Sequence, residues 1–252
     1  MPFPLRFVVC SLNLWADARW SEREEPVRQF FNYHRPDILA LQELRPVSRD
    51  LLDNLLRSYE RVDDPFSGWH FEGNIYWNSR LFRLLEYGAE AIGILESKRR
   101  LFWVRLRPRA EAAASTLLIA TAHYTWPGHQ EETETGVNPR TQQARETVAA
   151  LHRLNETGEA LIFMGDMNDF HHPLRVLRES GLEDAFRALG RTSPPTRPSQ
   201  LLRHEAPPQV NDWILHRGPL RPMCCDVVDF YAGGVPPSDH KPVLVTYALE
   251  ED

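Results

Sequence analysis

The chain has 252 residues, of which 42% are hydrophobic and 25% charged, and this composition is typical of a globular protein rather than a disordered or fibrous one. The formal charge of -6 at pH 7 excludes a strongly basic footprint for nucleic acid across the whole chain, although a local basic groove is compatible with it. Because α/β and sandwich folds of this length commonly form one domain, we expect a single catalytic domain over residues 1–252.

The N-terminal stretch MPFPLRFVVCSLNLW has one early arginine, a short apolar run and no small-residue cleavage site, so it does not have the features of a secretory signal. No apolar stretch approaches the ~20 residues that are needed to cross a bilayer. We therefore expect a soluble, cytoplasmic protein without membrane insertion. The sequence does not indicate a protein partner.

Strands and helices alternate at the start of the chain. LRFVVCSLNL at residues 5–14 predicts a strand, and EEPVRQFFNYH at 24–34 predicts a helix with Pro26 near its first turn, where a missing N–H does no harm. The nearly continuous apolar run at 36–44 predicts a strand that is covered on both faces, and leucines at helical spacing predict a second helix at 47–59.

The second part of the chain begins with strands that follow one another without a helix, which implies an antiparallel or mixed sheet. A long helix then starts after Asn138, which can cap it, with Pro139 at its first position. The predicted strands of this part are 73–79, 80–88, 100–108, 115–125, 159–168, 210–218, 224–233 and 241–249. We predict an α/β fold, a four-layer α/β/β/α sandwich of two packed mixed sheets flanked by helices.

A proline-rich and polar segment at residues 191–208 predicts a long loop. Loops of this length inside compact domains are often functional. A flap over a site is one interpretation of this segment.

Polar side chains stand at the ends or starts of several predicted strands, where rigid scaffolds present reactive groups. Taken singly, each has a structural explanation such as a cap or a turn. Independent turns, however, have no reason to reproduce one ordered set. The set is Asn13, Glu43, His123, Asp166, Asn168, Asp212, Asp239 and His240.

The order N…QE…H…GDxN…D…SDH resembles that of the endonuclease/exonuclease/phosphatase family of metal-dependent phosphoesterases. It is carried by LQE at 41–43, GDMN at 165–168 and SDHKPV at 238–243, and the resemblance runs from residue 7 to about residue 246. The three motifs are weak singly and specific together. The resemblance implies the same four-layer sandwich.

Phosphate esters repel nucleophiles, so their hydrolysis needs positive charge on the phosphate oxygens and an oriented water. Hard oxygen ligands can hold a mostly hydrated Mg²⁺ for this purpose, with Mn²⁺ as a substitute ion. Glu43 is the primary candidate ligand, with Asn13 and Asp239 near it. The resemblance implies that Asp166 orients or deprotonates the attacking water and that Asn168 holds a phosphate oxygen or the partner of that water.

The resemblance also implies roles for two histidines. His240 would bind phosphate as imidazolium or pass protons, oriented by Asp212, and His123 would stabilise phosphate charge or act on the leaving group. Glu72 falls where some deoxyribonucleases place the carboxylate partner of the latter histidine, although a surface glutamate is the simpler account. Arg140 has two interpretations, an anchor for the long helix and a phosphate contact.

Side-chain alternation along an extended strand predicts that Asp166 and Asn168 point together and that Met167 turns away to pack. Trp15, two residues past Asn13, and Trp126, in HYTWPG, are candidates for stacking on a base.

Asn74, in EGNIYW, is a third candidate for substrate contact. Family membership would fix the bond type rather than the substrate. We predict a Mg²⁺-dependent phosphodiesterase, with nucleic acid or a nucleotide as the favoured phosphate ester. The alternatives are a phosphatase or lipid phosphodiesterase acting on a small phosphorylated head group, and a non-catalytic binding module on the same fold.

Overall fold

The computed structural model describes residues 4–110, 116–199 and 207–250. Two six-stranded sheets form in this part of the chain. The strands of the first sheet are β1 (Arg6–Asn13), β2 (Ile38–Gln42), β3 (Tyr59–Arg61), β4 (Gly73–Asn78), β11 (Leu220–Val227) and β12 (Val243–Leu249). Those of the second sheet are β5 (Phe82–Glu90), β6 (Leu101–Pro108), β7 (Leu117–His123), β8 (Ala160–Asp166), β9 (Glu183–Asp184) and β10 (Asp212–Arg217).

Both sheets are mixed and are built alike. The first has the order β11-β12-β1-β2-β4-β3, and the second the order β5-β6-β7-β8-β10-β9. Each contains one parallel pair, β1 with β2 and β7 with β8, joined through a helical crossover, while the other neighbours are antiparallel. The carboxyl ends of two parallel pairs are therefore available to form one site.

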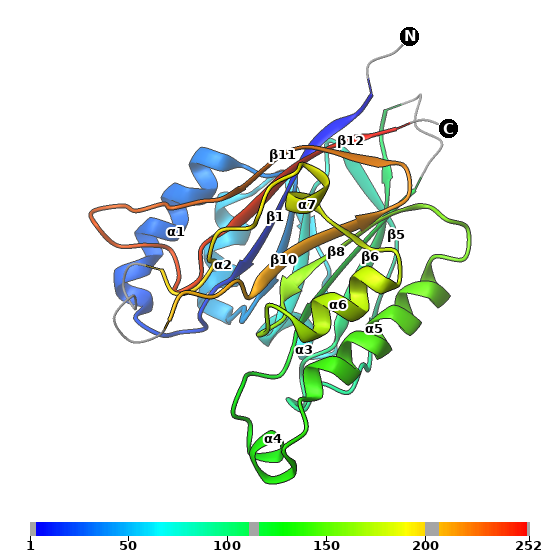
Figure 1. Ribbon diagram of the computed structural model, residues 1–252. Helices are drawn as coiled ribbons and strands as arrows, with labels where there is room; N and C mark the ends of the chain where they lie inside the picture. Colours follow the sequence, from blue (N-terminus) through cyan, green and yellow to red (C-terminus); the bar gives the residue numbers. More distant parts are fainter. Residues whose placement is uncertain (1–3, 111–115, 200–206, 251–252) are drawn as a thin grey trace.

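Seven helical segments accompany the sheets in the described residues. They are α1 (Trp20–His34), α2 (Pro46–Leu55), α3 (Gly68–Phe71), α4 (Gln130–Thr135), α5 (Pro139–Leu154), α6 (His172–Glu179) and α7 (Ala185–Ala188). Figure 1 shows α1 and α2 outside one sheet and α5 and α6 outside the other. None of the described helices combines the length and the apolar character required to span a membrane.

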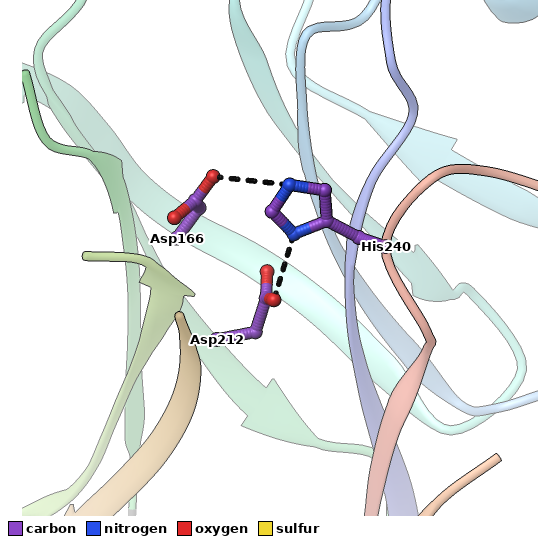
Figure 2. A group of neighbouring side chains, drawn as sticks. All are labelled: Asp166, Asp212 and His240. Carbon is purple, nitrogen blue, oxygen red and sulfur yellow. Dashed lines mark hydrogen bonds and ion pairs between the residues drawn. The ribbon is translucent and has the colours of Figure 1, made fainter. Parts of the chain in front are cut away.

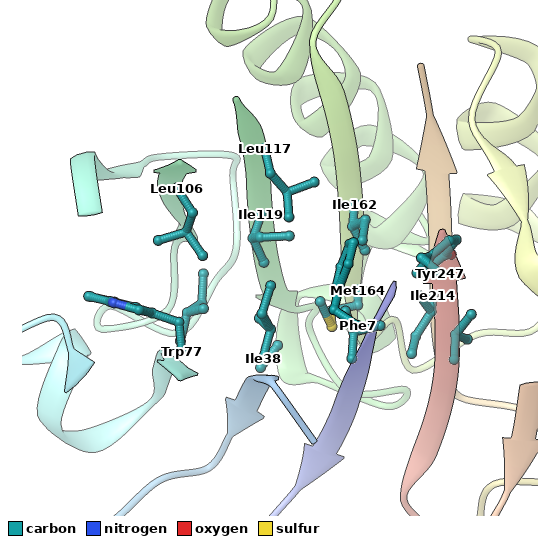
Figure 3. Close-up of a cluster of buried hydrophobic side chains, with 14 of the residues drawn as sticks. Phe7, Ile38, Trp77, Leu106, Leu117, Ile119, Ile162, Met164, Ile214 and Tyr247 are labelled. Atoms are coloured by element: carbon teal, nitrogen blue, oxygen red, sulfur yellow. The ribbon is translucent and has the colours of Figure 1, made fainter. Parts of the chain in front are cut away.

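Three buried hydrophobic clusters correspond to the three interfaces of four layers. The largest lies between the sheets, where Ile38 and Trp77 of the first sheet face Ile119 and Ile162 of the second (Figure 3). A second cluster joins α5 and α6 to the second sheet, and a third joins α1 and α2 to the first. Burial of each large apolar side chain stabilises the fold by about 1.5–3 kcal/mol. The predicted α/β/β/α sandwich is thus confirmed.

The structure departs from the predicted elements at one helix start, in one strand and in the short segments. The strand predicted at 224–233 is β11, which starts four residues earlier and ends at Val227. Helix α1 begins at Trp20, so Pro26 lies in its second turn rather than near its first. Arg19 precedes the helix in a left-handed conformation and makes no side-chain cap, and the sequence therefore gives no start signal there. The short elements β3, β9, α3, α4, α6 and α7 were not predicted, because so few residues show little periodicity.

The loop at 191–208 is described only in part, since residues 200–206 lie outside the described residues. Its two described flanks pair through an isolated antiparallel bridge between Arg197 and Gln209. The flap interpretation falls in part on the segment that is not described.

Gly165, immediately before the polar end of β8, is required by the backbone. Its φ is 152°, and an added Cβ would overlap the carbonyl oxygen of Ala122 on the neighbouring strand β7. We expect Gly165→Ala to lower the free energy of unfolding by about 2–4 kcal/mol, because the side chain would force the two strands apart. Chemical denaturation measures this loss.

Gly158 provides the matched control for that substitution. It also has a positive φ, 74°, but nothing lies within 4 Å of an added Cβ. Gly158→Ala should therefore cost only the backbone strain, about 1–2 kcal/mol. Equal losses in the two variants would contradict the role assigned to the close approach of β7.

Candidate active site

Strand direction brings the predicted polar residues together. In the first sheet Asn13 at the end of β1 lies beside Gln42 at the end of β2, and in the second sheet His123 at the end of β7 lies beside Asp166 at the end of β8. A hydrogen bond of 3.0 Å from Asn13 Nδ2 to Asp166 Oδ2 joins the two pairs across the sandwich. The facing carboxyl ends therefore form one cluster.

Antiparallel neighbours add the remaining members. Asp212, the first residue of β10, lies opposite Asp166 in the register of the second sheet. Strand β12 starts at Val243, opposite Ser11 of β1, so the residues before it pass the end of β1. Ser238 Oγ accordingly donates a 2.6 Å hydrogen bond to the carbonyl oxygen of Asn13.

His240 lies between two carboxylates (Figure 2). Its Nδ1 is 2.8 Å from Asp212 Oδ2, and its Nε2 is 3.7 Å from Asp166 Oδ2. Thr196 Oγ1 donates a 2.6 Å hydrogen bond to the same Asp212 oxygen and accepts one from the Asp212 backbone N–H. The imidazole is thereby held in one orientation, with Nδ1–H donating to Asp212 and Nε2 facing Asp166.

The cluster is charged although it is buried. Burial acts to lower the pKa of His240, but the carboxylates of Asp212, Asp166 and Asp239 outweigh it and raise that pKa to about 10. Burial acts to raise the pKa of Asp166, but the charges of His123 and His240 hold it well below its usual range. At neutral pH an imidazolium therefore faces a carboxylate.

Asn168 reaches the cluster by a route that side-chain alternation did not predict. Strand β8 ends at Asp166, and Asn168 has a left-handed φ of 49°. Its backbone N–H donates to Asp166 Oδ1 (2.8 Å), and its Nδ2 donates to the Tyr124 carbonyl oxygen (3.0 Å) and lies 3.1 Å from His123 Nε2. Met167 between them is buried in the core, as predicted.

Glu43 and Asp239 supply further carboxylates to the same cleft. Glu43 has a φ of 53°, and its Oε1 accepts a 3.2 Å hydrogen bond from Asn13 Nδ2. Asp239 Oδ2 lies 3.3 Å from Arg197 Nε. Carboxylate oxygens in a partly exposed cleft fit a hard divalent cation.

A second group of potential metal ligands lies around His240, but its atoms already contact one another. Asp166, Asp212 and His240 present ligand atoms within 4.8 Å of one another. The two His240 nitrogens, however, already face the two carboxylates, and a hard cation prefers oxygen ligands to imidazole. Glu43 and Asp239, which both line the cleft, are therefore the better candidates for holding a hard divalent cation.

The cluster opens into a cleft of about 550 Å³. Trp15 and Trp126 both line it, and Trp126 is 48% exposed. Two arginines that the sequence did not single out, Arg99 and Arg197, line it as well. The cleft thus combines carboxylates, imidazoles, guanidinium groups and two indole rings.

Arg23 is a further residue that sequence reasoning missed. It is fully buried in α1, and its Nη1 donates to the carbonyl oxygens of Leu14 (2.9 Å) and Pro237 (2.8 Å). Its guanidinium also lies 5.2 Å from the Trp15 ring. Arg23 therefore ties the loop after β1 to the loop before β12, although an arginine in an amphipathic helix usually indicates a solvated position.

Three other candidate residues, Asn74, Arg140 and Glu72, form contacts outside the cluster. Asn74 forms hydrogen bonds with Val62, Trp69 and the backbone of its own strand, so its amide does not serve the cleft. Arg140 binds Glu132 and the carbonyl oxygen of Thr125, which anchors α5.

Glu72 is not the carboxylate partner of His123. It pairs with Arg99 (3.1 Å) and Arg45 (3.6 Å). In the described part of the chain, His123 Nδ1 has no hydrogen-bond partner. Glu72 therefore contributes to the cleft indirectly, by pairing with Arg99, which lines it.

Comparison with known proteins agrees with this fold. The family model "Endonuclease/Exonuclease/phosphatase family" matches residues 10–240. No curated protein matches the chain significantly in sequence.

Solved structures share the fold at low sequence identity. TDP2 of D. rerio, solved with a single-strand DNA product, is 19% identical, with coverage of 96% of this chain and 98% of that one and a TM-score of 0.76. The human Nocturnin catalytic domain with bound sulfate is 19% identical, with coverage of 97% and 96% and a TM-score of 0.76. A mannosyl-6-phosphatase from Bacteroides thetaiotaomicron is 18% identical, with coverage of 96% and 99% and a TM-score of 0.77.

Proposed function

Because the chain belongs to the endonuclease/exonuclease/phosphatase family and is therefore a phosphate ester hydrolase, we propose that it is a Mg²⁺-dependent phosphodiesterase that cleaves nucleic acid or nucleotides. The observation that carries the proposal is that two tryptophans, Trp15 and Trp126, line the same cleft as Asp166 and the two histidines. Aromatic rings beside a phosphate site favour a substrate with a planar base. Membership of a family of hydrolases speaks against a non-catalytic binding module.

Glu43 and Asp239 would hold the Mg²⁺, with Asn13 beside them through the hydrogen bond from its Nδ2 to Glu43 Oε1. These residues offer hard oxygen donors at the mouth of the cluster, and the Glu43 side chain is 22% exposed, which leaves room for the ion to remain mostly hydrated. When bound, the ion supplies positive charge that stabilises the developing charge on the phosphate oxygens.

Asp166 accepts the proton of the attacking water. Its low pKa keeps it ionised, and its Oδ2 faces Asn13, His123 and His240. As the water oxygen forms its bond to phosphorus, the ester P–O bond breaks and the water proton passes to this carboxylate. A carboxylate fixed at a strand end keeps the water in line for attack.

The histidines and Asn168 act on the phosphate and on the leaving group. His240 remains protonated beside Asp212, so it places a positive charge near the phosphate oxygens. The His123 imidazole and the Asn168 amide, whose Nε2 and Nδ2 lie 3.1 Å apart, stand beside each other in the cleft, where they would contact a phosphate oxygen. A protonated histidine can also donate its proton to the leaving oxygen.

A phosphatase acting on a small phosphorylated head group is the second candidate. Arg99 and Arg197 both line the cleft, and additional guanidinium groups suit the dianion of a terminal phosphate. One protein of the same fold is described as a mannosyl-6-phosphatase, which makes this class a specific alternative.

Hydrolysis of a substrate panel in Mg²⁺, with and without EDTA, tests the proposal. The panel holds single-stranded RNA, single- and double-stranded DNA, bis-(p-nitrophenyl) phosphate, p-nitrophenyl phosphate, mannose 6-phosphate, inositol phosphates and sphingomyelin. We expect cleavage of oligonucleotides that EDTA abolishes. Hydrolysis confined to the monoesters would make the phosphatase the correct assignment.

Trp126→Ala tests base stacking. Loss of one stacking partner should raise KM for an oligonucleotide by about 5- to 150-fold, since such stacking is worth about 1–3 kcal/mol, and should leave kcat nearly unchanged. Tyr33→Ala is the control, because Tyr33 is an aromatic residue of α1 that is 80% exposed. An unchanged KM in Trp126→Ala would remove this residue from the binding site.

A further inference from the structure

A second cavity, of about 590 Å³, lies beside the catalytic cleft. Its walls come from the loop after β8, from α6, β9 and α7, from the segment 191–195 that follows α7, and from residues 208–213 at the start of β10. The labelled elements α6, α7 and β10 lie near one another in Figure 1. Gln209 lines both the cleft and this cavity, so the two adjoin. We call it the arginine pocket after its principal residues, which are Arg178, Arg187, Arg191, Phe170 and Trp213.

The arginine pocket is positively charged in a chain that is acidic overall. Its lining includes one carboxylate, that of Asp184. Both oxygens of this carboxylate are already bonded, to the Phe186 N–H (3.0 Å) and to Arg178 Nη2 (2.8 Å). Arg191 Nη1 donates to the Cys225 carbonyl oxygen, and no carboxylate among the described residues pairs with Arg187. The guanidinium groups therefore retain donors for an anion.

The pocket also offers aromatic surface and unused donors. Phe170 is 59% exposed, whereas Trp213 is 7% exposed and lies 5.7 Å from the Arg178 guanidinium. Trp213 Nε1 and Arg178 Nε are buried and have no acceptor in the part of the chain that the structure describes. Buried donors without acceptors are unfavourable. Both side chains line the pocket, so a ligand with oxygen acceptors would lie beside these donors.

We propose that the arginine pocket is a second substrate subsite, which binds the phosphate and the base of a nucleotide adjacent to the scissile phosphodiester of a single-stranded nucleic acid. This inference rests on the proposed function. Both adjoining cavities combine cationic groups with aromatic rings, and a nucleic acid strand repeats an anion and a planar ring in the same way. A single strand fits this surface because its bases are free to stack on side chains, whereas a duplex keeps its bases inside.

Arg187→Gln tests the inference without disturbing the catalytic cluster. Arg187 is an exposed residue of the short helix α7, so folding should be unaffected. We expect the Kd of a fluorescent ten-nucleotide strand to rise about 5- to 10-fold. The slope of log K against log salt should fall by about 0.7, the value for one phosphate contact on a single strand.

Binding is measured in an Asp166→Asn background, so that turnover does not interfere. A dinucleoside monophosphate supplies the second readout, because it has one phosphodiester and no adjacent phosphate. Its kcat/KM should be the same in Arg187→Gln as in the wild type. Arg145→Gln, which changes an exposed arginine of α5, is the matched control and should bind the strand as the wild type does.

The outcomes separate this inference from the proposed function. If Arg187→Gln and Phe170→Ala both bind the strand with wild-type affinity and salt slope while the wild type cleaves it, the subsite is wrong and the nuclease assignment stands. If the wild type neither binds nor cleaves oligonucleotides and hydrolyses only monoesters, the proposed function is wrong, and the subsite is then wrong as well.

Discussion

Replacing Asp166 by asparagine is expected to lower kcat by about 10²- to 10⁴-fold, the usual contribution of a positioned general base. The amide has the same size but cannot accept the proton of the attacking water. In the structure this carboxylate is the point at which Asn13, His123 and His240 converge, so no neighbouring oxygen occupies the same place. The measurement is kcat on bis-(p-nitrophenyl) phosphate at saturating Mg²⁺.

The control for this substitution must separate chemistry from folding. Asp166 is buried, and its charge compensates that of the histidines, so the variant should be compared with the wild type by thermal unfolding and circular dichroism. Asp50→Asn is the matched change at a 64% exposed carboxylate of α2, and it should keep wild-type kcat. A folded Asp166→Asn protein with wild-type turnover would show that another group activates the water.

Most of the fold could be predicted because its strands are long and apolar. The strands β1, β2, β7 and β8 are almost wholly buried, and runs of this kind are visible in a sequence. A polar side chain directly after such a run marks the end of the strand. For this reason Asp166 and His123 could be selected as candidate site residues.

Contacts between distant segments could not be predicted in this way. Arg23 looks like a solvated helix residue in the sequence, yet it binds the carbonyl oxygen of Pro237, 214 positions away. Arg197 belongs to a loop whose place over the cleft follows from its bridge to Gln209. Nothing local in the sequence encodes either contact.

The prediction that Asn74 contacts substrate was wrong because its side chain points to the other face of its strand. Asn74 stands near the start of β4, close to the end of β2 in the sheet register. Its side chain, however, turns toward Val62 and Trp69. In a strand buried on both faces, the apolar pattern does not show which face a polar residue takes.

Glu43→Gln is expected to raise the Mg²⁺ concentration that gives half-maximal activity by at least about tenfold, since even indirect partners of metal ligands contribute 10- to 100-fold. Glutamine keeps an oxygen that can accept the hydrogen bond from Asn13 Nδ2 but removes a full negative charge from the donor set. The remaining carboxylate, Asp239, is already partly neutralised by Arg197. Titration of Mn²⁺ by calorimetry measures the same loss without reference to activity.

Glu72→Gln is the matched control for the metal site. Glu72 is also a partly buried carboxylate near the cleft, but it pairs with Arg99 and Arg45 rather than with the cluster, so its loss should leave the affinity for the ion unchanged. If the two variants gave the same metal titration, Glu43 would not be a ligand, and the donor set would have to be sought around Asp239 and Asp166. If Glu43→Gln alone weakens binding, the left-handed backbone at this residue has a function, because it directs the carboxylate that follows buried strand β2 into the cleft.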